Sequence, residues 1–303
     1  MRPRLSCEWL HACSGCEIAL LNCGERLLAL LERVEIVHFP LLMDHKYSDR
    51  GDAAEIALPE AEIGLVSGGV ASEEHLAVLR AMRRQCRTLV ALGTCATHGG
   101  IPALCNQWPV DQAMGTVFSG VGGNNTYPVE VPAPLDRVYS IDEQVTVDLC
   151  VPGCPPRPET IVAVIEALLA GEKPPLPNKS VCETCPTVRA GKGQRTVHRF
   201  LANADYDPRA PVAEMRCLLE QGLLCMGPVT AGGCGGPDAP LCIRARVPCR
   251  GCYGPVRPGG NPLLDMLNGL ASNGIDHRTI VDRRSLLRFS GAHGLLKPLG
   301  RRG

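Results

Sequence analysis

The sequence predicts an α/β fold, with a doubly wound parallel sheet in residues 1–178 and a mostly irregular domain in residues 179–303. Short apolar segments alternate with helical segments throughout the first part, which is typical of parallel strands joined by helices. A proline-rich stretch at residues 171–177 separates the two parts and indicates a domain boundary. The second part shows little periodicity, yet residues 179–260 hold eight of the 17 cysteines. We expect such a segment to be stabilised by metal ligation as well as by core burial.

The elements can be assigned in order from the residue pattern. Strands are expected at residues 4–10, 34–39, 63–66, 89–92 and 145–149. Helices are expected at residues 17–31, 72–84 and 158–169, with a short one at residues 263–271. Gly24 is the weak point of the first helix, Ser72 is a good N-cap for the second, and Pro158 suits the first turn of the third. Residues 104–136 lack clear periodicity, include the glycine-rich residues 120–125, and predict a long loop.

Composition excludes several classes of function. The 303 residues carry 31 basic and 31 acidic side chains, so the net charge does not indicate nucleic acid or an anionic membrane as a partner. No run of about 18 apolar residues predicts a membrane span, and the N-terminus does not resemble a secretory signal. We therefore expect a cytoplasmic chain, in which abundant thiols more often bind metal than form disulfides. The tail at residues 276–303 is basic and is expected to be solvated or to face a partner.

Cysteines follow three of the predicted strands. Cys13 and Cys16 come after the first strand, Cys95 after the fourth and Cys154 after the fifth. The carboxyl ends of parallel strands lie at one edge of the sheet, where ligands bind in folds of this kind. We therefore expect these four thiols to hold one metal centre.

Three CxxC pairs indicate three such centres, because a 4Fe–4S cluster needs four thiolates and a CxxC turn can supply two of them. The first pair is completed by Cys95 and Cys154, as above. In chain order the second domain offers two further sets: Cys182, Cys185, Cys217 and Cys225, then Cys234, Cys242, Cys249 and Cys252. The spacing also permits an exchange of partners between these two sets.

Structural zinc is the alternative to iron–sulfur clusters. Zinc ribbons place two CxxC pairs about 15–20 residues apart, and the gaps here are far longer, which favours iron–sulfur clusters. The remaining cysteines are expected to be small buried apolar side chains: Cys7, Cys23, Cys86, Cys105 and Cys150. No GxGxxG or GxxxxGK[ST] sequence indicates a nucleotide site, so the chain is expected to relay electrons between two partners.

Three segments resemble the small subunits of nickel–iron hydrogenases. The segments at residues 13–17 (CSGCE), 93–96 (GTCA) and 152–156 (PGCPP) are similar to the proximal-cluster motifs of that family, in the same order. The segments at residues 225–228 (CMGP) and 249–252 (CRGC) are similar to its distal and medial cluster motifs. The resemblance covers nearly the whole chain. It implies a flavodoxin-like first domain that presents the proximal cluster to a nickel–iron centre in a large subunit.

The resemblance also implies a role for each cysteine set. Cys13, Cys16, Cys95 and Cys154 would hold the proximal cluster; Cys234, Cys242, Cys249 and Cys252 the medial; and Cys182, Cys185, Cys217 and Cys225 the distal. Electrons from hydrogen oxidation would pass through three 4Fe–4S clusters in that order, and the chain itself would hold no catalytic residue. Glu17 beside the proximal loop would line the large-subunit interface or a proton route, or would simply stabilise the start of a helix.

Two departures from the periplasmic and membrane-bound branches narrow the resemblance. Those branches usually have a His where Cys182 stands, and often lack the fourth medial cysteine that Cys242 supplies. The pattern resembles the soluble, methyl-viologen-reducing type, whose electrons reach a heterodisulfide-reductase-type complex through a small iron–sulfur protein. The deazaflavin-reducing hydrogenases are the nearest alternative. A quinone-oxidoreductase subunit is less similar, because that family has adjacent cysteines in its cluster loop.

Overall fold

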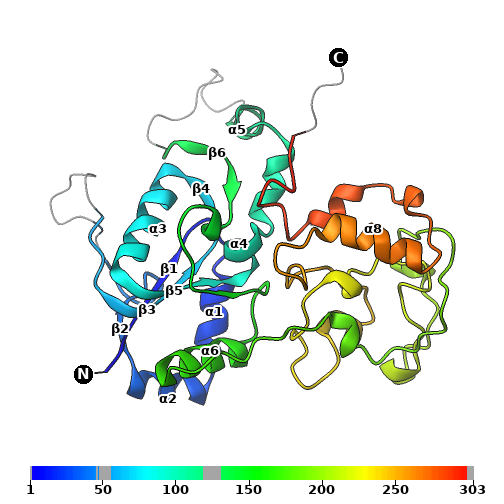
Figure 1. The fold of residues 1–303 in the computed structure, drawn as a ribbon, viewed down its shortest axis with the longest axis horizontal. Helices are drawn as coiled ribbons and strands as arrows, with labels where there is room; N and C mark the ends of the chain where they lie inside the picture. Colours follow the sequence, from blue (N-terminus) through cyan, green and yellow to red (C-terminus); the bar gives the residue numbers. More distant parts are fainter. Residues whose placement is uncertain (1, 46, 48–55, 119–130, 299–303) are drawn as a thin grey trace. The chain divides into compact units, whose positions relative to one another are not determined.

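The computed structural model describes residues 2–45, 47, 56–118 and 131–298, and it divides the chain into two compact units. The first unit contains Met1–Pro175 together with Phe289–Gly303, and the second contains Leu176–Arg288 (Figure 1). The break between Pro175 and Leu176 falls close to the boundary predicted at residue 178. The second division corrects the prediction that the whole of residues 179–303 forms one domain, because the chain returns to the first unit after Arg288.

A five-stranded parallel sheet forms the centre of the first unit. Its strands are β1 (Arg4–Trp9), β2 (Glu35–His38), β3 (Ala61–Ser67), β5 (Cys86–Leu92) and β7 (Leu149–Val151). They lie in the order β2-β1-β3-β5-β7, and every neighbouring pair is parallel. This is the flavodoxin-like order, in which the strand order reverses between β1 and β3. The predicted doubly wound α/β fold is confirmed.

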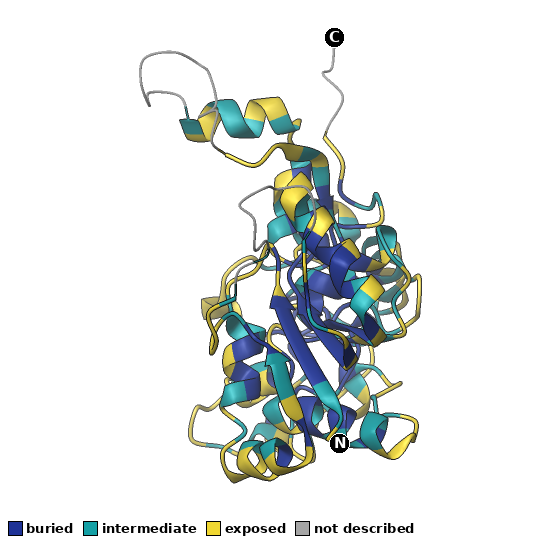
Figure 2. Cartoon of the chain, turned by 90° about the vertical axis from the view of Figure 1, so that its left-hand side faces the viewer, coloured by how far each residue is buried: buried dark blue, intermediate teal, exposed yellow. Residues whose placement is uncertain are grey.

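Helices cover the sheet, which is mostly buried as Figure 2 shows. Helix α3 (Glu73–Gln85) begins at the predicted N-cap, where the Ser72 hydroxyl accepts a hydrogen bond from the His75 N–H. Its apolar side packs with β3 and β5, which is how Leu79 and Met82 become fully buried. Helix α6 (Pro158–Ala170) also matches the prediction and packs against the N-terminal helices α1 (Gly15–Leu21) and α2 (Glu25–Arg33).

Three predicted features of the first unit are wrong in detail. The single helix at residues 17–31 is two helices, because Gly24 has φ +60° and interrupts it. The last strand starts at Leu149, since Val145 and Val147 pack against the α3 side of the core. Residues 104–136 are not one loop: they include a 3-10 helix (Pro102–Gln107), α5 (Val110–Phe118) and β6 (Pro134–Tyr139). The glycine-rich residues 120–125 lie outside the described residues.

A second, antiparallel pair of strands and the returning tail complete this unit. Strand β6 pairs with β4 (Val70–Ser72), and short α4 (Gly93–His98) follows β5. The tail packs on α4: the Ala292 N–H donates to the His98 carbonyl, and a Cβ on Gly99 would lie 2.8 Å from the Ala292 Cβ. The basic tail is therefore not wholly solvated as predicted, because its small residues allow close packing.

A buried polar network joins β1, β2 and the segment that follows β2. The Glu8 carboxylate lies 2.8 Å from the His38 Nε2 and accepts a hydrogen bond from the Tyr47 hydroxyl, also at 2.8 Å. The side chains of Glu8 and His38 are 1% and 0% exposed. Because a charged group buried without a partner is very unfavourable, this pair fixes the relative positions of the two strands.

The second unit has little regular structure. Its two α-helices within the described residues are α7 (Leu241–Arg244) and α8 (Pro262–Ser272); the latter was predicted at residues 263–271. Short 3-10 helices make up much of the rest. The apolar core under α8 contains Met266 and Leu270 and also the cysteines Cys225 and Cys249. Thiols thus lie inside the apolar core of this unit. In the described part of the chain, no helix is long and apolar enough to span a membrane.

Candidate metal centres

The carboxyl edge of the sheet gathers the first four predicted cysteines. Cys13 and Cys16 stand where β1 leads into α1, Cys95 lies in α4 directly after β5, and Cys154 follows β7. The pKa of the Cys16 thiol is raised by burial and further by its neighbours Cys95, Cys154 and Cys13, because nearby thiolates repel one another. Burial and the nearby Cys154 likewise raise the pKa of Cys95 to about 12. The structure therefore brings all four thiols together.

The backbone packs closely against two of these thiols. Gly93 has φ +84°, and a Cβ at this position would overlap the Cys16 Sγ. At Gly100, a Cβ would lie 2.6 Å from the Cys95 Sγ. Side chains larger than hydrogen are thus excluded beside two of the thiols. Four soft sulfur donors in such a cradle suit an iron–sulfur cluster.

Glu17 lies next to this set, with its side chain buried. Its carboxylate accepts a short hydrogen bond from the Ser67 hydroxyl, while Oε2 has no partner among the described residues. Burial raises the pKa of Glu17, and the Ser67 hydrogen bond partly opposes this rise. The side chain therefore does not act only at the exposed start of α1, as the helix-dipole interpretation would require.

In the second unit, Cys182 lies at the centre of one set of thiols. Burial raises the pKa of Cys182 to about 12, and Cys225, Cys185 and Cys217 raise it further while Arg189 lowers it. A Cβ on Gly227 would approach the sulfurs of Cys182 and Cys225 to 3.1 and 3.6 Å. These are the four cysteines that chain order placed in one set.

Cys249 lies within the other set. Burial raises its pKa to about 12, and the nearby Cys252 and Cys242 contribute to the rise. Cys252 also packs in one apolar cluster with Cys234, Ala231 and Tyr253. The structure thus also brings together the members of the remaining set.

Backbone N–H groups point at the sulfurs of both sets. The Cys249 N–H donates to the Cys225 sulfur over 3.2 Å, and the backbone N–H groups of Gly227 and Gly251 donate to Cys225 and Cys249. Such bonds favour a thiolate and tune the potential of an iron–sulfur cluster. The Cys225–Cys249 contact also joins the two sets directly. Among the residues described, no three His, Cys, Asp or Glu side chains converge on a site for a single metal ion.

Comparison with known proteins identifies the family. A sequence profile described as the NADH ubiquinone oxidoreductase, 20 Kd subunit, matches residues 13–168, slightly more than half of the chain. A vhu subunit of the F420-non-reducing hydrogenase from Methanococcus voltae is 35% identical over 294 residues, covering 95% of this chain and 95% of the relative. The chain belongs to this family of nickel–iron hydrogenase small subunits. Its sequence resemblance to the methyl-viologen-reducing type is thereby confirmed.

Solved structures agree with this assignment. In the NAD⁺-reducing nickel–iron hydrogenase in its H₂-reduced state, one chain is 37% identical, with a TM-score of 0.53. That match covers 58% of this hydrogenase small subunit and 96% of the other chain. A nickel–iron–selenium hydrogenase from Desulfomicrobium baculatum shares the fold at 19% identity and a TM-score of 0.51, over 86% of this chain and 97% of that one.

One residue that the sequence did not single out joins two cysteine loops of the small subunit. The Thr94 hydroxyl accepts a hydrogen bond from the Gly153 N–H, and the Thr94 N–H donates to the Gly153 carbonyl, both over 2.8 Å. Thr94 and Gly153 directly precede Cys95 and Cys154. The pair therefore fixes the separation of these two thiols. A threonine next to the predicted ligand Cys95 is the only sign of this contact in the sequence, because its partner Gly153 is 59 residues away.

The five remaining cysteines of the hydrogenase small subunit do not share one environment. Cys7 and Cys86 are buried in the sheet, as predicted, and Cys23 is half-buried. Cys105 and Cys150 are exposed, which corrects the prediction for these two. Cys105 is on a short 3-10 helix, and Cys150 is on the strand at one edge of the sheet.

The edge that carries the first cysteine set is apolar on its outer surface. Cys13 and Cys154 are exposed there. Large apolar side chains at the end of β1, on α1, after β2 and after α4 are also exposed: Trp9, Ile18, Leu41, Leu42, Met43 and Ile101, at 37–55%. Several large apolar side chains exposed near one edge of a fold are typical of a protein–protein interface. This edge of the small subunit therefore has the properties of a subunit interface.

Proposed function

We propose that the chain binds three 4Fe–4S clusters as the electron-transfer subunit of a cytoplasmic nickel–iron hydrogenase. The gathering of twelve cysteines into three sets of four is the observation that carries this proposal. The proximal cluster is assigned to Cys13, Cys16, Cys95 and Cys154; the medial to Cys234, Cys242, Cys249 and Cys252; and the distal to Cys182, Cys185, Cys217 and Cys225. When bound, the clusters would supply one-electron transfer between the large subunit and an acceptor.

The large subunit is proposed to cover the carboxyl edge of the sheet. The exposed thiols and apolar side chains at that edge support this placement, since both would be buried by a partner. In this arrangement Glu17 lies just beneath the interface, and its unpartnered Oε2 supports the proton-route assignment over a purely structural one. Glu17→Gln should slow proton exchange more than electron transfer to a dye, whereas equal effects would remove Glu17 from the route.

We further propose that electrons leave through a small iron–sulfur protein to a heterodisulfide-reductase-type complex. Support comes from the relatives, which are named as not reducing the deazaflavin F420. The cytoplasmic location accords with a chain that keeps many thiols reduced. Activity of the purified complex with methyl viologen and without the deazaflavin is expected. Reduction of the deazaflavin at comparable rates would favour the alternative type.

Metal analysis tests the cluster proposal directly. The anaerobically purified complex should contain about twelve iron and twelve sulfide per small subunit, beyond the iron of the large subunit. Cys182→Ser should remove one cluster signal from the electron paramagnetic resonance spectrum of the reduced complex, while the matched Cys105→Ser should remove none, because the exposed Cys105 belongs to no set. About four iron per chain, or stoichiometric zinc, would contradict the proposal.

A further inference from the structure

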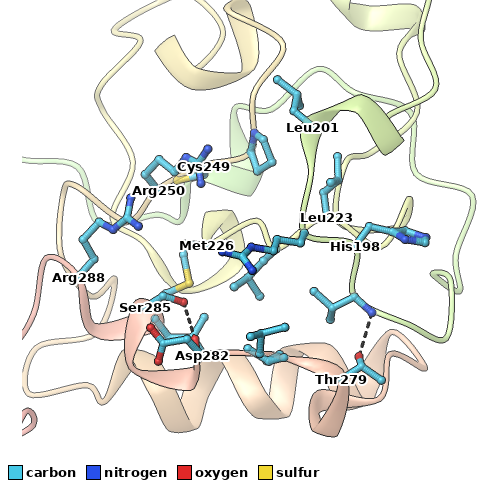
Figure 3. A pocket seen from close by; sticks show the side chains of 17 residues that line it. His198, Leu201, Leu223, Met226, Cys249, Arg250, Thr279, Asp282, Ser285 and Arg288 are labelled. Atoms are coloured by element: carbon cyan, nitrogen blue, oxygen red, sulfur yellow. Dashed lines mark hydrogen bonds between the residues drawn. The ribbon is translucent and has the colours of Figure 1, made fainter.

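A pocket of about 330 Å³ opens in the second unit, beside the two cysteine sets. Apolar side chains form much of its wall, including Leu223, Met226 and Leu286, together with the Cys249 thiol (Figure 3). Cys249 belongs to one proposed cluster set, and its N–H donates to the sulfur of Cys225 in the other. Cys225 itself lies between Leu224 and Met226, which both line the pocket, so a partner bound there would be close to both sets.

Positive charge dominates the side chains that line the pocket. Arg199, Arg250 and Arg288 are all exposed. Asp282 is the only carboxylate in the lining, so the lining residues carry a net formal charge of +2 (three arginines minus one aspartate) with His198 neutral. Arg250 and Arg288 lie on the same side of the pocket as Cys249 (Figure 3). Within the described residues, none of the three arginines forms an ion pair with an acidic side chain of this chain. Their charges are available to an anionic partner.

Apolar side chains are exposed around and beside the pocket. Val281 and Leu201, which line it, are 81% and 38% exposed. Phe200 is 65% exposed and stacks against the Arg199 guanidinium at 5.6 Å from the ring centroid. Aromatic and arginine side chains of this kind are enriched at the centres of protein interfaces.

We propose that this surface docks an acidic electron-transfer protein, which accepts electrons from the distal set at Cys225, whose chain neighbours Leu224 and Met226 line the pocket. The inference rests on the proposed function and names the chemistry of its partner. Complementary charge would steer the acidic protein toward the arginines, and the exposed Phe200 and Val281 would provide apolar contact. A small anion alone would leave those two side chains in water, which is why a protein is the better occupant. Electron transfer slows steeply with distance, so docking at the wall formed by Leu224 and Met226, on either side of Cys225, is productive.

Binding measurements test this proposal without relying on turnover. The complex of large and small subunits, loaded with its clusters, would be immobilised and titrated with an acidic bacterial ferredoxin at low and high ionic strength. Arg199→Glu and Arg288→Glu should each weaken binding about tenfold at low salt, because like charges then face one another. High salt should reduce the difference between variant and wild type. Arg209→Glu is the matched control, since Arg209 is exposed in the same unit but does not line the pocket.

Hydrogen-dependent reduction of ferredoxin provides the second readout. The KM for ferredoxin should rise in the pocket variants, relative to the rate of methyl viologen reduction by the same preparation. Unchanged binding and KM in both variants, in a complex that reduces the dye, would overturn the docking site. Equal weakening by Arg209→Glu would also overturn it, because charge alone would then explain binding. Loss of clusters or of dye reduction in the wild-type complex would instead refute the proposed function.

Discussion

The two units of this chain are held together in different ways. In the first, a five-stranded parallel sheet is covered by helices, and residues such as Val66, Leu79 and Leu89 are completely buried. In the second, long irregular segments surround small apolar clusters in which cysteines take the place of aliphatic side chains. Hydrophobic burial can stabilise the first unit without metal, while we expect the second to depend on the cross-links that its proposed clusters would supply.

This difference separates two roles of cysteine that look identical in a sequence. The proximal set lies on loops at the edge of a sheet that is formed by other residues. The proposed distal and medial sets are part of the core itself, as Cys225 and Cys249 show by their burial beside Met266. Loss of a proximal thiol should therefore affect function more than folding, and loss of a distal or medial thiol should affect both.

Removal of all clusters should give the largest effect. After treatment of the small subunit with a chelator and an oxidant, we expect the amide hydrogens of residues 176–288 to lose protection almost completely. Those of β3 and β5 should stay protected, because hydrophobic contacts close that core. Hydrogen exchange followed by mass spectrometry measures both units in one sample. Equal loss of protection in the two units would show that the comparison is wrong.

Glu8→Ala should produce the next largest effect, confined to the first unit. Removing Glu8 leaves the buried His38 ring nitrogen and the Tyr47 hydroxyl without their hydrogen-bond partner, which costs about 1–3 kcal/mol for each group. Glu166→Ala is the control: Glu166 pairs with Arg26 at 3.2 Å, but the two side chains are 40% and 47% exposed, so about 0–1 kcal/mol is expected. Urea denaturation gives the loss of unfolding free energy for both variants. Similar losses would show that the Glu8–His38 pair does not stabilise the fold.

Gly93→Ala should disrupt the proximal site without unfolding the unit that carries it. The new Cβ would meet the Cys16 sulfur, and the backbone has positive φ, so we expect loss of the proximal cluster, about four iron atoms, with the sheet retained. Gly171→Ala is matched: Gly171 also has positive φ, at +69°, but nothing lies within 4 Å of the added Cβ. Only backbone strain of about 1–2 kcal/mol should follow there, with full iron content.

The smallest effect on stability is expected from His293 and Asp142, the pair that holds the returning tail. The hydrogen bond from His293 to Asp142, at 2.9 Å, raises the pKa of His293; burial raises that of Asp142, but the bond to His293 lowers it overall. Both groups are charged between the ordinary pKa values of 3.8 and 6.5. The stabilisation is therefore lost as pH rises through the folded pKa of His293 and as it falls through that of Asp142.

His293→Ala should accordingly cost about 1 kcal/mol near pH 5.5, because the pair is only partly buried. Near pH 8.5 the difference from the wild type should be smaller. Urea denaturation at the two pH values is the measurement. A cost that does not change with pH would mean that His293 contributes packing rather than charge.

Much of the first unit could be predicted because its signals are local. Short apolar segments, the Ser72 N-cap and Pro158 each act within a few residues, and both helix starts were placed correctly. The cysteine set at the sheet edge followed from the topology that these elements define. In the second unit, chain order predicts two sets of four cysteines, and this grouping stays a prediction, because spacing alone allowed other pairings and Cys225 contacts Cys249 across the two sets.

The features that were missed depend on contacts between distant residues. Thr94 bonds to Gly153, Glu8 bonds to His38, and the small residues at 291 and 292 pack on Gly99 and Ala103. No periodicity marks such pairs, because each is defined by the folded chain and not by its neighbours in sequence. The break at Gly24 and the antiparallel β4–β6 pair were missed for similar reasons.

The return of the tail to the first unit also constrains biosynthesis. The segment that braces the Cys95 helix, around Ala292 and His293, follows every cysteine of the chain in sequence. The ribosome therefore completes the whole second unit before the last piece of the first becomes available. Until then α4 lacks the backbone bond from Ala292 to His98. The proximal site can reach its final form only after translation has passed the distal and medial cysteines, so the order of synthesis delays its closure.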